Sequence, residues 1–272
     1  MQQFSFTDNV YADGEPYLKG FLGLDWCPSA EAKRNASNYE ADIIYMLGQL
    51  YGKFVSSRVL IGIGQYKDKK VIIRPRPIPD PDSAEPETKD QEESRLYNAG
   101  AKPSDSADSF PQGAQFKPNV PGKEPWQVAP IVGTGKGTNV EINFNPGVYP
   151  DAMGQGPFVL PSDAGLLHEL VHAMSDVSAT RASGMSGPDG YDDLEEFTAV
   201  VVANVYRSEV GEPLLGGHST QPMPLLLSGS QAFYNRYTSY MQQVCANHPW
   251  LAGELRKATG IVHNPFVCCT GV

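Results

Sequence analysis

The spacing of apolar and polar residues predicts an α+β chain. Apolar residues recur three and four positions apart between about residues 39 and 54, which predicts a helix. Two short β-rich runs follow at 59–63 and 70–74, and the polar residues between them predict a hairpin. Polar and apolar residues alternate over 138–144, which predicts a half-exposed strand.

The second half of the chain is predicted to be mainly helical. A helix is expected to begin at Ser162, whose hydroxyl suits an N-cap, and a loop rich in Ser and Gly follows over 176–190. A second helix is expected from about 192 to 208, and further helices at about 231–246 and 251–258. Together these elements predict a small twisted sheet, a helix beneath it and a helical C-terminal part.

Composition divides the chain into four segments that we expect to form one compact domain. Residues 1–75 carry the helix and hairpin that pack on the body, and residues 76–127 form a flexible insertion rich in Pro and acids. Between residues 80 and 108, nine acids and three bases give a net charge of −6, so an acidic recognition surface is the alternative. Residues 128–220 form the core with the candidate chemistry, and residues 221–272 form C-terminal helices.

The charge of the whole chain limits its partners. A net charge of −10 argues against a nucleic-acid partner and against binding to an anionic membrane surface. No segment approaches the run of about 18 apolar residues that a membrane-spanning helix needs. The N-terminal residues lack a basic region followed by an apolar core, so we expect no classical signal peptide and a different route of export.

Four cysteines leave the redox compartment open. None belongs to a C-x-x-C pair, so a structural zinc site made of cysteines is not expected. Cys268 and Cys269 are adjacent and would bridge each other only with strain. Either could pair with Cys27 or Cys245 in an oxidising compartment, and free thiols are the alternative.

The strongest chemical signal in the chain is the sequence His-Glu-Leu-Val-His. His168 and His172 lie one helical turn apart, so both imidazoles can bind one Zn²⁺. Glu169 is close enough to accept a proton from a zinc-bound water, whose pKa falls to about 7. Gly165 and Ser175 share the face of the two histidines, and their small side chains are expected to leave an open cleft for substrate.

The third metal ligand must come from another part of the chain. A catalytic zinc ion normally keeps three protein ligands and one open position. The next helix offers Glu195 and Glu196, whose side chains point about 100° apart, so only one of them readily faces the metal. The spacing alone leaves the choice between them open.

The motif and the residues after it resemble a known family. His-Glu-Leu-Val-His-Ala, followed downstream by Glu196-Phe-Thr-Ala, is similar to the gluzincin arrangement of lethal-factor-type toxins. The wider pattern resembles the effector-type zinc metallopeptidases, found among bacterial type III effectors and as C-terminal toxin domains of type VI VgrG spike proteins. The resemblance covers about residues 138–220. It implies a zincin-like fold, with Glu196 as the third zinc ligand.

The resemblance also implies roles for residues around the metal. Tyr191 is the first candidate for the donor that stabilises the oxyanion, because lethal-factor-type proteins place a Tyr shortly before the ligand Glu. His218 is the second candidate, by analogy with thermolysin-like enzymes, and Tyr206 is the third. A hydrogen-bond acceptor for a zinc-bound histidine is also expected, and Asp176 and Asn204 are both candidates.

These features predict a zinc-dependent metalloendopeptidase that acts as a secreted bacterial toxin or effector. The expected partners are a protein or peptide substrate in a target cell, a cognate immunity protein and a secretion-spike domain, with delivery by a contact-dependent secretion system. An extended substrate is expected to add to the strand at 138–144, provided that this strand is an edge. Two alternatives stay open: a zinc-containing binding module without peptidase activity, and a zinc amidase that cleaves a cell-wall bond.

Overall fold

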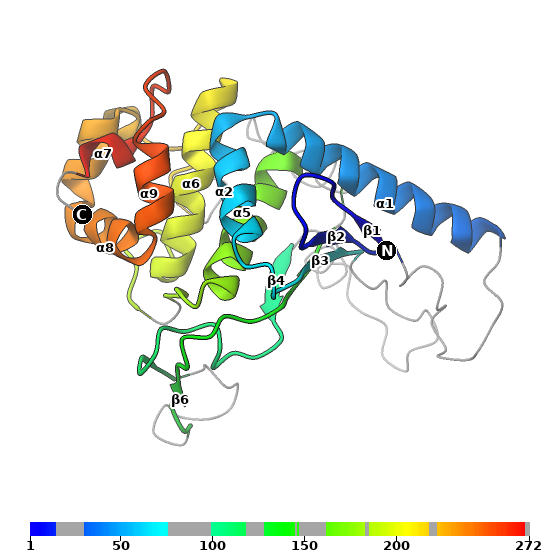
Figure 1. Ribbon diagram of the computed structural model, residues 1–272. Coiled ribbons are helices and arrows are strands. Elements are labelled where there is room, and N and C mark those ends of the chain that lie inside the picture. Colours follow the sequence, from blue (N-terminus) through cyan, green and yellow to red (C-terminus); the bar gives the residue numbers. More distant parts are fainter. Residues whose placement is uncertain are drawn as a thin grey trace, which may run out of the picture.

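The computed structural model describes residues 1–14, 30–75, 99–117, 128–144, 146, 162–182, 185–217 and 222–269. These residues form a mixed structure of helices and small sheets, which confirms the α+β class (Figure 1). The strands are β1 Gln2–Gln3, β2 Val10–Ala12, β3 Val71–Arg74, β4 Gly100–Pro103, β5 Gln115–Phe116, β6 Ile131–Val132 and β7 Val140–Asn143. The α-helices are α1 Ala30–Tyr51, α2 Phe54–Gly64, α5 Ser162–Val177, α6 Leu194–Val210, α7 Ser230–Arg236, α8 Thr238–Asn247 and α9 Pro249–Leu255.

The main sheet has five strands in the order β1-β2-β3-β7-β4. β2, β3 and β7 run parallel, with Val71 opposite both Val10 and Val140. β1 and β4 are antiparallel to their neighbours and form the two edges among the described strands. The predicted strand at 138–144 is therefore correct as β7 but lies inside the sheet, so it cannot be the edge that accepts an added strand.

The predicted hairpin at 59–74 is wrong in its first half. Val59, Leu60 and Ile63 lie in α2 and are fully buried, with the spacing of one helical face. The second half does form a strand, β3, but its partners are β2 and β7, both of which run parallel to it. A short apolar run fits either a strand or a buried helix, and packing against other helices decided the outcome here.

The predicted helix at 39–54 corresponds to most of α1, which begins earlier, at Ala30. The chain turns at Gly52 and Lys53, and α2 begins at Phe54. The Glu209 carboxylate of α6 accepts from the backbone N–H groups of Phe54 (2.6 Å) and Val55 (2.9 Å). A carboxylate at this helix end is favourable because the N-terminal N–H groups carry positive potential.

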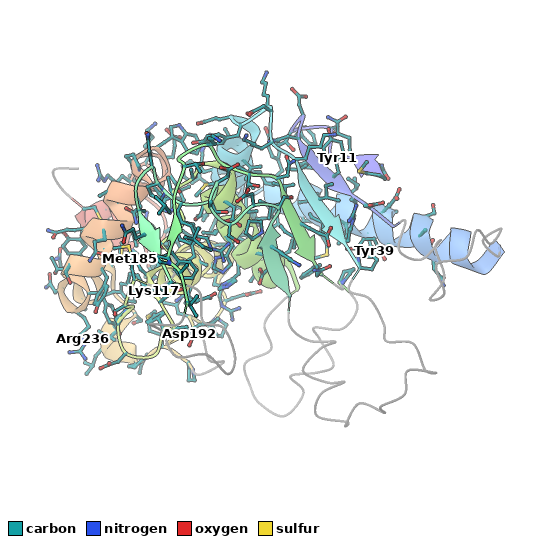
Figure 2. All side chains as sticks on the ribbon, turned by 90° about the horizontal axis from the view of Figure 1, so that it is seen from below. Tyr11, Tyr39, Lys117, Met185, Asp192 and Arg236 are labelled. Atoms are coloured by element: carbon teal, nitrogen blue, oxygen red, sulfur yellow. The ribbon has the colours of Figure 1, made fainter. Side chains whose placement is uncertain are left out.

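Three helices, α2, α5 and α6, stand side by side between the sheet and the C-terminal helices (Figure 1). Much of their contact surface is apolar and fully buried, as at Leu60, Leu170 and Val201. α1 packs on the sheet side, where the hydroxyl of Tyr39 donates to the carbonyl of Phe144 at 2.9 Å (Figure 2). This packing fixes α5, the helix that carries both motif histidines, against both the sheet and α6.

A close backbone contact joins the sheet to the end of α5. Gly137, just before β7, has a φ of +70°, and a Cβ at this position would lie 2.0 Å from the carbonyl oxygen of Val177. Only glycine fits such an approach. The N–H of Thr138 donates to the carbonyl of Asp176 at 3.1 Å, so the start of β7 is tied to the last turn of α5.

The predicted flexible insertion at 76–127 is wrong for its described part. Residues 99–117 form β4 and β5, and β4 pairs with β7 along its whole length. Phe110 is buried and stacks on Phe116 with ring centroids 4.9 Å apart. The rest of the insertion lies outside the described residues.

The C-terminal segment is helical as expected. The single helix expected at 231–246 is divided at Tyr237 into α7 and α8, and α9 follows. Cys245, Cys268 and Cys269 carry free thiols, and Cys27 lies outside the described residues. Within the described ranges, every helix is either too short or too polar to cross a bilayer.

Candidate metal centre

Helix α5 brings the two motif histidines together. His168 and His172 are one turn apart, and their Nε2 atoms face each other at 3.0 Å. His172 is almost entirely buried, whereas the side chain of His168 is 16% exposed. The expected cleft along this face is wrong at Gly165 and Ser175, which are both buried because α5 packs into the core on that side.

Helix α6 supplies the acidic residues of the site. Asp193 caps its N-terminus, and the Asp193 carboxylate accepts from the backbone N–H of Glu196 at 2.9 Å. Gly211, with a φ of +81°, ends the helix. The cap fixes where the first turn begins and therefore where Glu195 and Glu196 point.

His168, His172 and Glu196 form a cluster suited to a metal ion. The Glu196 carboxylate lies 3.2 Å from His168 Nε2 through one oxygen and 3.3 Å from His172 Nε2 through the other. Ligand atoms bound tetrahedrally to Zn²⁺ at about 2.0–2.2 Å lie about 3.3 Å from one another. The two Nε2 atoms are 3.0 Å apart and each lies close to a different oxygen of the same carboxylate, so the three side chains are near enough to share one metal ion.

Glu195 lies on the opposite side of the His172 ring. Its Oε1 is 3.3 Å from His172 Nδ1, and its Oε2 accepts from the backbone N–H of Ala182 at 2.8 Å. If His172 Nδ1–H donates to Glu195, the lone pair of Nε2 points to His168 and Glu196. The geometry therefore separates the two carboxylates: Glu196 joins the ligand cluster, and Glu195 orients a ligand.

The two carboxylates favour a positive charge on or between the imidazoles. Burial alone lowers the pKa of His172, but hydrogen bonds with Glu195 and Glu196 and the charge of Glu169 hold that pKa well above its usual value. Burial opposes ionisation of Glu195, yet His172 lowers the pKa of Glu195 to about 2. The two histidines likewise lower the pKa of Glu196 far below its ordinary value, against the effect of burial. Either a proton on an imidazole or a bound metal cation would supply this positive charge.

The remaining candidate residues have different surroundings. Glu169 is buried on α5, close enough to His172 for its charge to act on that imidazole. Tyr191 is buried against Phe197, with ring centroids 4.9 Å apart, and burial raises its pKa. Tyr206 donates to the Asp163 carboxylate at the start of α5. His218 lies outside the described residues.

The two expected partners of a zinc-bound histidine form other hydrogen bonds. Both oxygens of Asp176 accept from Arg181, at 2.8 and 2.9 Å. Asn204 is bonded at 2.8 Å to both the N–H and the carbonyl of Leu215. The carboxylate that contacts His172 Nδ1 is that of Glu195, which the sequence analysis considered only as an alternative third metal ligand.

Arg181 is the residue of this region that the sequence did not suggest. It is held by Asp176, and its charge and that of Glu195 act on each other. No local pattern marks it, because it comes from the loop between α5 and α6 and reaches Asp176 only in the folded chain.

Comparisons with known proteins identified no relative of this chain. No family model matches the chain, and no curated protein and no solved structure is significantly similar to it.

Proposed function

We propose that this protein is a zinc-dependent metallopeptidase, with His168, His172 and Glu196 as the zinc ligands. The observation that carries the proposal is the cluster of two imidazole Nε2 atoms and one carboxylate, which lie close enough together to bind one ion. Two imidazoles and one carboxylate are also a donor set that catalytic zinc sites use, and this set leaves a position open.

Glu169 is the proposed general base. Bound zinc would supply Lewis acidity that makes a water molecule nucleophilic near neutral pH. Glu169 follows His168 directly on α5 and would accept the proton of that water, then pass it to the leaving amine. Its burial beside His172 keeps it close to the site and away from bulk solvent.

The second carboxylate, Glu195, would hold the His172 ring in its ligand orientation. It accepts at Nδ1, which leaves Nε2 as the ligand atom. The oxyanion donor is proposed to be Tyr191, with His218 and then Tyr206 as the further candidates. For Tyr206, the hydrogen bond to Asp163 would have to break first.

The edge strand β4 is the proposed place for an extended substrate. It is antiparallel to β7, is an edge among the described strands, and packs with β7 against α5. A peptide added alongside β4 would continue the sheet above the metal helix by main-chain hydrogen bonds. An antiparallel edge strand next to the motif helix supports a zincin-like arrangement.

The proposed biological role is that of a secreted bacterial toxin or effector that cleaves a protein in a target cell. This role rests on the resemblance of residues 138–220 to effector-type zinc metallopeptidases. A cognate immunity protein and a secretion-spike domain would be its partners.

Metal analysis and peptide cleavage test the proposal together. Purified protein should carry about one zinc per chain, and His168→Ala should lose it, whereas Asp192→Asn, an exposed acid near α6, should retain it. Glu169→Gln should keep zinc and lose cleavage of a peptide library. Wild-type protein that stays metal-free after incubation with zinc would refute the site.

The same experiment separates the alternatives. If zinc is bound but no peptide, protein extract or cell-wall fragment is cleaved, the protein is a zinc-containing binding module. Cleavage restricted to a cell-wall amide would make it an amidase.

A further inference from the structure

A concave site lies away from the metal cluster, between the end of α2, the end of α5 and the junction of α8 with α9. Its volume is about 330 Å³, at the lower end of the range of about 300–1,000 Å³ typical of small-molecule sites. Met174 lines it from the last turns of α5 and Ser178 lines it directly after that helix, two and six residues beyond His172. The metal ligands are not among its lining residues.

The lining of this cavity is uncharged. Among the described residues that line it, none is Asp, Glu, Lys or Arg. Its one histidine, His248, has a pKa lowered by burial against the opposing charge of Glu195, which favours the neutral imidazole. A charged ligand would lose its hydration here without a compensating ion, which is costly. The cavity therefore selects an uncharged ligand.

Hydrogen-bond directions fix how His248 is protonated. Ser178 Oγ donates its only hydrogen to the carbonyl of Met174 at 2.6 Å, so it accepts from Thr180 Oγ1 at 2.7 Å. Thr180 Oγ1 must then accept from His248 Nδ1–H at 3.3 Å. His248 Nε2 is left as an acceptor, and it has no partner among the described residues. Nε2 is covered by neighbouring protein atoms, so the polar groups that this cavity offers to a ligand are those of Thr180, Asn247 and Gln65.

One wall of the cavity is aromatic. Trp250 is 37% exposed and packs directly on α2, because a Cβ at Gly62 would lie 3.0 Å from its ring. Asn247 and Gln65 add amide groups, each with donors and an acceptor, and Tyr66 adds a second ring. The negative face of an indole attracts weakly positive C–H groups. A sugar ring presents such C–H groups on its face and hydroxyl groups at its edge.

We propose that this cavity binds a neutral saccharide, with Trp250 against the sugar face and Asn247, Gln65 and Thr180 at its hydroxyl groups. This inference is independent of the metal site, since the two sites share no residue. It adds a carbohydrate-recognition site to the protein whether or not the metal cluster is catalytic.

Saturation-transfer NMR with paired probes tests this site. Methyl β-D-glucoside and N,N′-diacetylchitobiose are the neutral probes, and methyl β-D-glucuronide and the deacetylated chitobiose are their charged counterparts. At millimolar concentrations, at least one neutral probe should receive saturation from the protein and bind more tightly than its charged counterpart. Tighter binding of the charged member of each pair, or no transfer to any neutral probe, would overturn the proposal.

Variants locate the binding to this cavity. Trp250→Ala should weaken binding about tenfold or more, and Trp250→Phe should restore part of it. Val262→Ala, an exposed apolar position outside the cavity lining, should change nothing. Trp250→Ala should keep the far-UV circular dichroism and the cooperative urea unfolding of the wild type, which shows that it folds without relying on the proposed metal centre. Unchanged saccharide binding in folded Trp250→Ala would refute the assignment.

Discussion

Replacing Glu195 with Gln separates its positioning role from direct metal binding. The substitution keeps size and shape but removes the charge and turns one oxygen into an NH₂ group. Two donors, His172 Nδ1–H and the N–H of Ala182, now share one acceptor, because Glu195 receives both in the folded protein. If the Gln oxygen stays on Ala182, its NH₂ group faces Nδ1–H, and His172 favours the tautomer with Nε2–H. That tautomer cannot bind a metal through Nε2.

The geometry of the Glu195–His172 contact sets the expected loss of zinc affinity in Glu195→Gln. Outer partners of metal-binding histidines typically contribute a factor of about 10–100 in metal affinity. The Oε1–Nδ1 distance of 3.3 Å is longer than the roughly 2.7–2.9 Å of a strong charge-assisted bond, which favours the lower end. We therefore expect zinc affinity to fall about tenfold, or about 1.4 kcal/mol. The free energy of unfolding without metal should also fall by about 1–3 kcal/mol, because a buried donor loses its acceptor.

Competition with a chromogenic zinc chelator measures the affinity, and urea unfolding in a metal-free buffer measures stability. Asp192→Asn is the matched control, since it removes one negative charge from an exposed side chain close to the same helix start (Figure 2). Glu196→Gln should weaken zinc far more than Glu195→Gln. The reasoning fails if folded Glu195→Gln binds zinc as tightly as the wild type, or if the two Glu variants are equally defective.

Three further predictions concern the support of the site and the stability of the fold. Asp193→Ala should reduce the free energy of unfolding by about 0.5–2 kcal/mol and weaken zinc binding, because the cap that positions Glu196 is lost; normal zinc affinity would contradict this. Asn204→Ala should lower the free energy of unfolding in urea by about 2–5 kcal/mol, because the backbone N–H and carbonyl of Leu215 both lose a buried partner. A decrease below about 1 kcal/mol would contradict this reasoning. Burial lowers the pKa of His263 in the folded state, so stability is full above the unfolded-state value of about 6.5 and falls as the pH drops below it. Urea unfolding measures this: the free energy of unfolding should fall less between pH 7.5 and pH 5.5 in His263→Gln than in the wild type. An equal fall in both proteins would show that His263 is not the cause of the pH dependence.

The local sequence was sufficient to predict the arrangement of those candidate residues that lie on the single helix α5. The i, i+4 spacing of His168 and His172 fixes their relation once α5 forms, and the structure places their Nε2 atoms together. The choice between Glu195 and Glu196 could not be made locally. It depends on where the Asp193 cap starts α6 and on how α6 packs against α5, which are set by tertiary contacts.

The errors in the predicted strands also arise because tertiary contacts, not local sequence, decide the structure there. The run at 59–63 is apolar and β-rich, but its buried residues match a helix as well as a strand, and only the neighbouring helices distinguish the two. The true edge strand, β4, reads Gly-Ala-Lys-Pro and has no strand signal, because its pairing with β7 comes from the backbone. A segment without large apolar side chains thus displaced β7 from the edge.

The adjacency of Glu195 and Glu196 has a consequence for the chemistry of the site. Successive helical positions differ by about 100°, so two neighbouring carboxylates cannot both reach one metal ion, but they can reach the two nitrogens of one imidazole. Here Glu195 is 3.3 Å from Nδ1 of His172 and Glu196 is 3.3 Å from Nε2. The first turn of α6 therefore contacts the His172 ring from both sides, whereas His172 itself belongs to α5. Any shift of α6 along α5 would therefore move Glu195 and Glu196 together relative to His172. We expect the packing of α6 on α5 to affect metal binding at the proposed centre through both carboxylates.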